Sequence, residues 1–349
     1  MTSPRLQDLT FEQLQDHLLE DGLPKFRAVQ VWQGLFGEMA ASYEDITPLP
    51  KTLRAALTLR LPWTRLDLLQ LVRSKDRKTA KALFQLEDGE TIESVIMIYP
   101  ERSTVCLSTQ VGCAMGCTFC ATGLGGFVRN LTPGEIVAQT CFAAKWLKDQ
   151  GRRLSNLVYM GMGEPLANYD ATLRSIRILN DSRGMGIGAR SFTISTVGLP
   201  DGIDRLADEP LQVNLAVSLH AATDQRRSRL VPVNDRYPIS AVLGACRRYI
   251  EKTHRRVSFE MTLIENVNDA ESDATELANL LQGMLCHVNL IPLNAPTTER
   301  SKLGTSSSDR VQAFADVLDR QGIPVSVRSS RGAEIDAGCG QLRARNASN

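Results

Sequence analysis

Hydrophobic and polar residues follow three successive patterns along this chain of 349 residues. Over residues 1–60, apolar residues recur at helical spacing in TFEQLQDHLLEDG and FRAVQVWQGLFGEM, and Thr10 is a typical helix N-cap. Over residues 61–98, KALFQL and TIESVIMIYP alternate like strands on either side of the turn signal EDGE. The pattern therefore predicts an N-terminal helical accessory domain followed by a short β linker.

From residue 99 onward, short β-branched runs alternate with helical stretches. The runs are TVCLSTQ, LVYMG, FTISTVG, VNLAVSLH, VSFEMTLI, VNLIPLN and IPVSVRS. One helix has well-marked ends, because Thr132 opens a capping box, Pro133 follows it, and Gly151 ends the segment. Such alternation predicts an α/β fold with a parallel sheet and crossover helices. About six repeats fit within residues 99–335, fewer than the eight of a closed barrel, so we expect a partial (βα)6 barrel. Residues 336–349 then form a C-terminal segment.

Composition and charge exclude several classes of protein. A hydrophobic content of 43% supports a sizeable core, and the N-terminus has no long apolar run, so we expect a cytoplasmic protein without a membrane span. Lys and Arg total 40 against 39 Asp and Glu, so the net charge of +1 gives no general attraction to RNA. Local basic patches would have to supply it, and the candidates are residues 73–81, Arg226, Arg255 and residues 343–346.

The stretch VGCAMGCTFCATGLGGF, residues 111–127, holds three closely spaced thiols, Cys113, Cys117 and Cys120. Their spacing also suits one face of a packed helix, but the stretch contains five glycines, each unfavourable in a helix by about 1 kcal/mol. Structural zinc needs four ligands, and no second pair of close thiols or histidines is visible. An iron-sulfur cluster fits better, because three cysteines leave one iron open to another ligand.

Other small and polar residues follow the predicted strands directly. Parallel sheets place ligand sites at the carboxyl ends of their strands, so we expect these residues to gather near the cysteines. Each also has a plainer explanation, since Pro165 marks an ordinary turn and a histidine at a strand end is often merely buried. The residues in question are Gly161, Gly163, Glu164, Ser195, Ser218, His220 and Asn294.

These motifs together resemble the RlmN/Cfr family of radical S-adenosylmethionine RNA adenine methyltransferases. The resemblance covers residues 93–342 and includes TVCLSTQVGCAMGCTFCATG, YMGMGEPLAN, STVGLPDGI, AVSLHAATDQRRSRLVPVNDRYPI and RGAEIDAGCGQL. KFRAVQVWQGLF is similar to part of the family's accessory domain. The likeness is closest to the RlmN branch, which methylates carbon 2 of adenine, whereas the Cfr branch methylates carbon 8.

The resemblance implies two cofactors. A 4Fe-4S cluster on Cys113, Cys117 and Cys120 would hold S-adenosylmethionine at its open iron and reduce it to start radical chemistry. Carbon 2 of adenine is electron-poor, so direct attack on a methyl group is implausible, and the cofactor performs the difficult step. The positions implied to bind S-adenosylmethionine are Gly163, Glu164, Ser195, Ser218, Leu219, His220 and Asn294.

The resemblance also implies three catalytic residues. Cys339 would first accept a methyl group, whose carbon then attacks the adenine, and Cys106 would release the joined RNA by thiol-disulfide exchange, forming a disulfide bond. Glu93 matches the family's proton acceptor, although Cys106 is the alternative. From the residues alone, each of the three has a plainer explanation. Cys339 fits an idle thiol near a loose terminus, Cys106 fits a buried cysteine on a strand, and Glu93 shows only a carboxylate on a strand.

The expected partners follow from the same resemblance. They are 23S ribosomal RNA, transfer RNA and an electron donor such as flavodoxin or ferredoxin. We expect the chain to be a monomer and to have no membrane partner. Residues 226–229, after the SLHAA strand end, are the preferred candidates for phosphate contact. Cys141, Cys246 and Cys286 lie in apolar patterns and are expected to be structural.

Three functions stay open on the sequence. The first is carbon-2 methylation, the second is Cfr-like carbon-8 methylation, and the third is a non-catalytic iron-sulfur or zinc protein that binds RNA. Cys106 and Cys339 argue against the third, because a binding module needs neither an exposed C-terminal thiol nor a thiol that resolves it.

Overall fold

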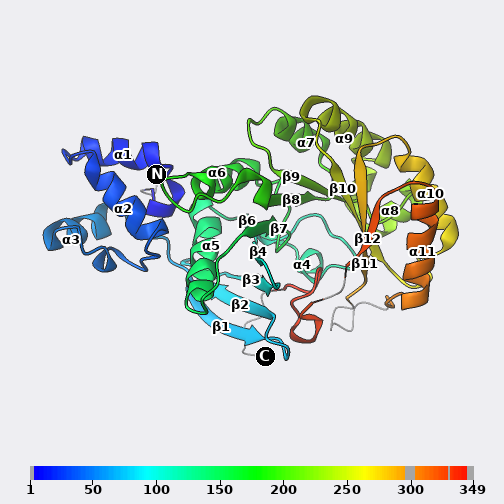
Figure 1. Cartoon of the computed structure of the whole chain (residues 1–349), viewed down its shortest axis with the longest axis horizontal. Coiled ribbons are helices and arrows are strands. Elements are labelled where there is room, and N and C mark those ends of the chain that lie inside the picture. The colour runs from blue at the N-terminus through cyan, green and yellow to red at the C-terminus, as the bar shows by residue number, and fades with distance from the viewer. Residues whose placement is uncertain (1–3, 295–302, 329–330, 344–349) are drawn as a thin grey trace.

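The N-terminal helices form a module at one end of the molecule (Figure 1). The computed structural model describes residues 4–294, 303–328 and 331–343. Thr10 caps the first long helix by accepting a hydrogen bond from the Gln13 N–H at 3.3 Å, as the sequence predicts. Trp32 and Phe36 fill the centre of the module with their rings in edge contact. The elements are η1 (Leu6–Asp8), α1 (Phe11–Glu20), α2 (Phe26–Phe36), η2 (Tyr43–Asp45) and α3 (Lys51–Arg60).

Three antiparallel strands connect this module to the rest of the chain. They are β1 (Asp67–Arg73), β2 (Thr79–Gln85) and β3 (Thr91–Ile98), and the predicted turn between the second and third is closed by the Leu86 N–H donating to the Glu90 carbonyl at 2.8 Å. The third strand also pairs antiparallel with β4 (Ser103–Cys106). The three strands therefore continue the main sheet, which has ten strands in the described residues.

The main sheet curves into the partial barrel that the sequence predicts. From β4 onward all neighbouring strands are parallel: β7 (Asn156–Tyr159), β8 (Phe192–Thr196), β9 (Asn214–Ser218), β10 (Val257–Leu263), β11 (Cys286–Pro292) and β12 (Val325–Val327). The crossovers carry α5 (Pro133–Lys148), α6 (Tyr169–Asn180), α7 (Pro200–Ala207), α8 (Asp224–Leu230) with α9 (Ile239–Thr253), α10 (Glu271–Leu281) and α11 (Ser308–Arg320). Among the described strands β1 and β12 form the two edges, so the sheet stays open.

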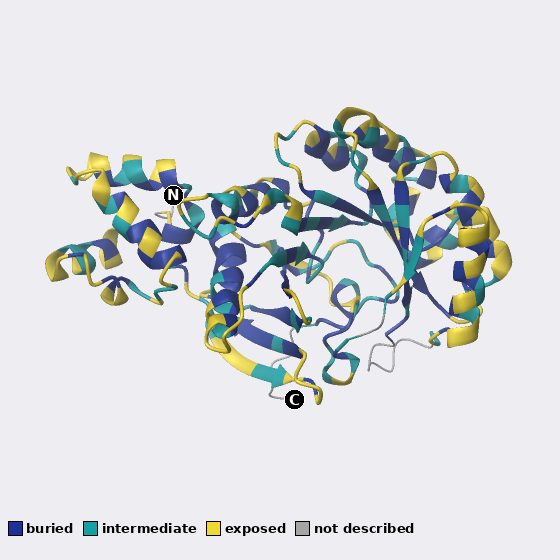
Figure 2. Ribbon diagram, in the orientation of Figure 1, coloured by how far each residue is buried: buried dark blue, intermediate teal, exposed yellow. Residues whose placement is uncertain are grey.

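Burial follows this arrangement (Figure 2). The strands of the barrel are dark with buried residues, and each outer helix turns one face to the sheet and one to solvent. The capping box at Thr132 and the proline at the start of α5 are present as predicted. Within the described residues, no helix is both long enough and apolar enough to cross a membrane.

Short elements complete the chain. The connection from β4 to α5 contains β5 (Gln110–Gly112), α4 (Ala121–Leu124) and β6 (Phe127–Asn130), where β5 and β6 pair as a small separate sheet. Three further single turns are η3 (Ala189–Ser191), η4 (Pro232–Asp235) and η5 (Ala333–Ile335). The three clustered cysteines fall in the connection, at the carboxyl end of β4.

Candidate active site

The three clustered thiols lie on an irregular loop, so the helical-stripe explanation does not hold. Only the four residues of α4 that follow Cys120 are helical. Gly112 and Gly116 have φ angles of +72° and +67°, which glycine adopts without strain. A side chain at Gly123 would come within 2.9 Å of the Cys117 nitrogen. The glycines therefore allow the backbone to wrap tightly around one point.

Cys113, Cys117 and Cys120 all face one cavity inside the barrel. Burial raises the pKa of Cys113 to about 12 and that of Cys117 well above its usual value, so thiolates here need a positive partner. No group of three or more metal-ligating side chains in the described residues is placed to hold a single metal ion. A cluster has one iron for each cysteine and does not require the sulfurs to meet at one point, so this donor set fits a cluster.

Glu164 lies opposite the thiols, in the loop after β7. Its carboxylate accepts hydrogen bonds from the backbone N–H groups of Leu166 at 3.0 Å and Val197 at 2.8 Å. Burial nevertheless raises its pKa to about 7, so the carboxylate lacks a cation. Gly163, at φ +103°, touches Gln110 so closely that a side chain would approach the Gln110 Cβ to 2.6 Å. The site thus presents a buried carboxylate beside bare backbone, which suits the ammonium group of an amino-acid ligand.

The ends of β8 and β9 complete this wall. Ser195 and Ser218 line the cavity, as does His220, whose Nδ1 accepts a hydrogen bond from the Thr262 N–H at 3.1 Å. Burial lowers the pKa of His220 to about 3, so the ring is neutral. Leu219 differs from its neighbours, because its side chain is fully buried in the core and does not line the cavity. Only its backbone is available to a ligand.

The C-terminal segment returns across the cysteine loop and brings Cys339 into the same cavity. It is fixed there by the Ala121 N–H, which donates to the Gly340 carbonyl at 2.7 Å, and by the Thr122 hydroxyl, which donates to the Leu342 carbonyl at 2.5 Å. The Asn294 side-chain amide donates to the Cys339 carbonyl at 3.4 Å. Asn294 therefore contacts this segment and is not among the cavity-lining residues.

Cys339 is surface-accessible, but the surface it reaches is the cavity interior. The surrounding protein raises the pKa of its thiol, while the nearby Arg328 guanidinium acts in the opposite direction. Cys106, the last residue of β4, is buried, and its pKa is raised to about 12 by burial and by the neighbouring Cys339. Two thiols more than 200 residues apart in sequence are thus near enough for the charge on one to affect the pKa of the other.

Glu93 is held away from the cavity. It is buried on β3, where Lys81 pairs with one carboxylate oxygen at 2.9 Å and the Arg343 N–H donates to the other at 2.8 Å. It is not among the lining residues of the thiol cavity. In this structure Glu93 anchors the segment that carries Cys339.

The expected disulfide bond is not supported. All eight cysteines fall within the described residues and all are free thiols. Cys246 and Cys286 are buried, as expected for structural residues, and Cys141 is partly buried on α5. Burial raises the pKa of Cys141 and of Cys246 to about 12, which leaves both thiols protonated and unreactive.

Two charged residues of the cavity are absent from the sequence-based set. Glu260 on β10 and Arg328 after β12 both line it and form an ion pair at 3.4 Å. The sequence contains one signal for this pair, because Glu260 stands inside the apolar run VSFEMTLI and a charge in a buried strand needs a partner.

The preferred phosphate contacts, residues 226–229, are largely committed to other partners. Arg227 is fully buried and donates to carbonyls at the ends of β8 and β9, while Arg226 pairs with Asp273 and Glu276. Of this segment's arginines, only Arg229 is exposed.

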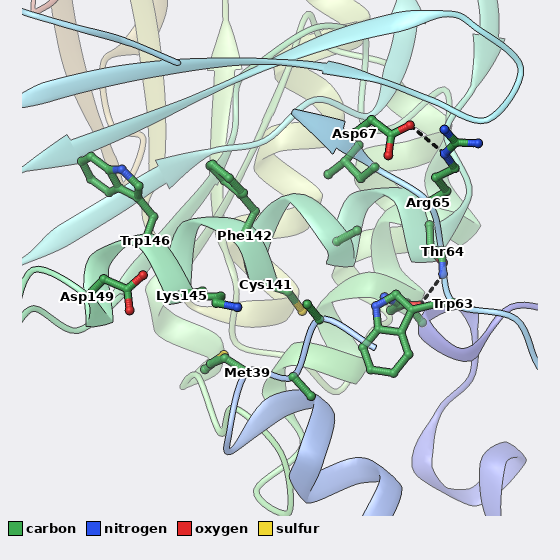
Figure 3. Close-up of a pocket in the computed structure, with 15 residues that line it drawn as sticks. Met39, Trp63, Thr64, Arg65, Asp67, Cys141, Phe142, Lys145, Trp146 and Asp149 are labelled. Atoms are coloured by element: carbon green, nitrogen blue, oxygen red, sulfur yellow. Dashed lines mark hydrogen bonds and ion pairs between the residues drawn. The ribbon is translucent and has the colours of Figure 1, made fainter. Parts of the chain in front are cut away.

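A second large cavity lies outside the barrel, between the N-terminal module, β1 and α5 (Figure 3). Trp63, Phe142 and Trp146 form much of its wall, and Cys141 points into it. Its charges balance, since Arg65 and Lys145 are offset by Asp67 and Asp149. It contains none of the residues expected to bind cofactor or to react.

Comparisons with known proteins agree with the site. Residues 107–278 match the model of the radical SAM superfamily, and residues 5–61 match that of the ribosomal RNA large subunit methyltransferase N-terminal domain. A protein of Chloroflexus aurantiacus named "Probable dual-specificity RNA methyltransferase RlmN" is 48% identical over 97% of this chain and 93% of its own. A protein of the same name from Thermotoga neapolitana is 47% identical, covering 97% of both chains.

A solved structure shows the same fold. The crystal structure of a radical SAM methyltransferase from Sphaerobacter thermophilus superposes with a TM-score of 0.96 at 53% identity, covering 98% of this chain and 100% of the other. The chain therefore belongs to the RlmN family of radical S-adenosylmethionine RNA methyltransferases, as its motifs predict.

Proposed function

We propose that this enzyme methylates carbon 2 of an adenosine in 23S ribosomal RNA and in transfer RNA, with Cys339 as the carrier of the new carbon. The observation that carries the proposal is the presence of Cys339 in the same cavity as Cys113, Cys117 and Cys120, with Cys106 beside it. A protein that only binds RNA has no use for a carrier thiol next to a resolving thiol.

Each group of residues has a part in this proposal. Cys113, Cys117 and Cys120 would hold the cluster, while Glu164 would accept the ammonium group of S-adenosylmethionine and the backbone at Gly163 would approach the ligand closely. Ser195, Ser218 and His220, with the backbone of Leu219, would line the rest of that ligand's site, and Asn294 would hold the Cys339 segment. When bound, the cluster and S-adenosylmethionine supply the radical that acts on an unreactive C–H bond.

The two thiols act in sequence. The Cys339 sulfur takes a methyl group from one S-adenosylmethionine, which would leave as S-adenosylhomocysteine. The carbon of that group loses one hydrogen atom to the radical that a second S-adenosylmethionine would supply, and it then forms a bond to the adenine carbon. The unpaired electron of the adduct would pass back to the cluster, and the proton on the adenine carbon leaves to a base. The Cys106 thiolate then attacks the Cys339 sulfur, so that the carbon–sulfur bond breaks, a disulfide forms, and the released carbon takes up one proton to become a methyl group. Two further electrons, from a donor such as flavodoxin or ferredoxin, must reduce this disulfide before the next turnover.

The proton acceptor in this proposal is Cys106 or Glu93. Glu93 supports the Cys339 segment through the Arg343 N–H, and Lys81 already neutralises its charge. Cys106 lies close enough to Cys339 for the charge on that thiol to raise its pKa. These contacts favour Cys106 as the base and give Glu93 a positioning role.

The division of labour along the chain is also part of the proposal. Residues 1–60 would bind RNA as an accessory domain, residues 61–98 would link it to the radical core of residues 99–335, and residues 336–349 would deliver Cys339. The chain would act as a monomer, because the groups of the proposed site all come from one copy.

The identity of the methylated product tests the proposal. The protein is expressed without oxygen, reconstituted with iron and sulfide, and supplied with S-adenosylmethionine, a reductant and RNA fragments from 23S ribosomal RNA and from a transfer RNA anticodon loop. Chromatography with mass spectrometry should identify 2-methyladenosine in the digested RNA. Detection of 8-methyladenosine would refute carbon-2 methylation and support the carbon-8 alternative. Methylation of RNA by Cys339→Ala would refute the carrier role of Cys339.

A matched variant separates the two thiols. Cys106→Ala should still accept a methyl group on Cys339 and join to RNA, but it should fail to release it, because the resolving thiol is missing. A denaturing gel with labelled RNA would then show a stable protein–RNA band. Normal release of product by this variant would contradict the role given to Cys106.

A further inference from the structure

The interior of the barrel opens at the amino ends of its strands as well as at the carboxyl ends. A cavity of about 590 Å³ is lined there by residues at the beginnings of β8, β9 and β10 and by the segment before β10. It shares three lining residues with the thiol cavity, namely Met160, Glu260 and Arg328. These three side chains therefore belong to the walls of both cavities.

This amino-end cavity is strongly basic. Four arginines line it, Arg102, Arg255, Arg256 and Arg328, against the single carboxylate of Glu260. Glu260 is already engaged, because the Asn289 side-chain amide donates to it at 2.8 Å and Arg328 pairs with it at 3.4 Å. The other three positive charges therefore have no carboxylate partner among the lining residues.

Two of these arginines are free to bind an anion. Arg255 is fixed by donating to the Val213 carbonyl at 3.2 Å and to the Asn214 side chain at 2.9 Å. In contrast, Arg102 and Arg256 are exposed, and within the described ranges neither side chain makes a hydrogen bond or an ion pair. Exposed, unpaired guanidinium groups around a cavity are typical of phosphate recognition.

The positive charge continues beyond the cavity around Tyr99, in the connection between β3 and β4. Arg102 and Arg331 both stack on the Tyr99 ring, at 4.6 and 4.3 Å from its centre, and Arg152 donates to the Tyr99 carbonyl at 3.1 Å. Glu101 is the one acid of this connection, residues 99–102. We call Arg102, Arg152, Arg255, Arg256 and Arg331 the basic rim.

The carboxyl end of the barrel is the alternative entrance, and two of the described segments cross it. The Thr118 N–H donates to the Leu230 carbonyl at 3.0 Å, which ties the cysteine loop to α8, and the Cys339 segment crosses the same loop. Arg226 there is already paired with Asp273 and Glu276, and Arg227 is buried, which leaves Arg229 as the exposed arginine of α8.

We propose that substrate RNA docks at the amino ends of the barrel strands, with the phosphates that flank the target adenosine on the basic rim and the base inserted past Arg328 toward Cys339. This inference rests on the proposed function and assigns the entrance and the phosphate contacts of that same site. An adenine must leave its stack before carbon 2 can react, and a basic cavity that shares its wall with the thiol cavity suits such an extruded nucleotide.

Arginine variants at the two ends of the barrel test this proposal. Arg102→Gln and Arg256→Gln remove rim charges outside the catalytic groups, and Arg229→Gln removes an exposed arginine near the carboxyl end as the matched control. Binding of a fluorescent RNA stem-loop is measured by anisotropy over a series of salt concentrations, with thermal melting and iron content checked for each variant. We expect each rim variant to bind roughly three to ten times more weakly and to lower the salt slope by about one, while the control stays within about twofold of wild type.

The possible outcomes separate the entrance from the function. Weaker binding by the control with unchanged rim variants would overturn the amino-end entrance, and so would unchanged binding by all three variants. If the rim variants bind weakly as expected but wild-type protein forms no methyladenosine, the entrance stands and the proposed function fails. At saturating RNA the rim variants should recover the wild-type rate, because they change RNA binding and leave the reacting groups intact.

Discussion

At the scale of single residues, local chemistry could be predicted from the sequence and long-range pairing could not. The cysteine loop was predictable because its thiols and glycines are neighbours in the chain. The Glu260–Arg328 pair joins residues 68 positions apart, and nothing in the local pattern around either indicates the other. The approach of Cys106 to Cys339 likewise depends on the path of the whole C-terminal segment. Only the family resemblance anticipated it.

His220 provides a prediction about pH at this scale. Burial lowers its pKa from an ordinary 6.5 to about 3, so the folded protein keeps the ring neutral while the unfolded chain binds a proton below pH 6.5. Its contribution to stability is therefore present above pH 6.5 and is lost as the pH falls toward 3. At pH 5.5 the loss relative to pH 7.5 should be about 1.4 kcal/mol, or roughly 2 °C in Tm.

His220→Asn is the matched variant for this measurement. The asparagine oxygen replaces Nδ1 as acceptor for the Thr262 N–H, and asparagine tolerates the φ of +61° at this position. Melting curves at pH 7.5 and 5.5, with both proteins in the same metal state, should show a smaller loss of Tm for the variant. An equal loss in the two proteins would show that His220 does not titrate as the structure indicates.

At the scale of elements, capped helices were predicted well and the position of the β linker less well. Thr10 and Thr132 mark the starts of α1 and α5 because capping depends on residues within one turn. The linker strands were recognised, but their continuation into the barrel sheet depends on the pairing of β3 with β4. Helix α8 illustrates the same limit, because its basic residues suggested RNA contact and the fold instead buries Arg227.

Arg227 is expected to hold the ends of β8 and β9 in place. Its guanidinium donates to the Leu219 carbonyl at 3.1 Å, the Asn234 side chain at 2.8 Å and the carbonyls of Val197 and Ser218. Arg227→Met would leave several buried acceptors without donors, so we expect a loss of about 3 kcal/mol or more and weaker binding of S-adenosylmethionine. Denaturant unfolding and calorimetric titration would measure both.

Arg229→Met on the same helix is the control for this prediction. Arg229 is exposed, so its replacement should change stability by no more than about 0.5 kcal/mol. If Arg227→Met were as stable as this control, the buried guanidinium would not support the strand ends.

At the scale of the whole molecule, the fold class followed from the repeated strand–helix alternation. The cavity at the amino ends of the barrel strands could not be predicted from that alternation. The net charge of +1 hides an asymmetry, since arginines without carboxylate partners among the lining residues collect at the amino ends of the strands, while Arg227 of α8 is buried and Arg226 is paired with carboxylates. Composition averages over such differences. Only the folded arrangement shows that the basic amino-end cavity and the thiol cavity share wall residues.

The central claim is that Cys339 carries the carbon that becomes the methyl group of the RNA product. The most direct measurement uses S-adenosylmethionine with a fully deuterated methyl group and determines the mass of the methyladenosine formed by the reconstituted protein. Because the carried carbon loses one of its three hydrogen atoms before it bonds to adenine, the product should contain two deuterium atoms in its new methyl group. A product with all three deuterium atoms would mean direct methyl transfer and would contradict the account.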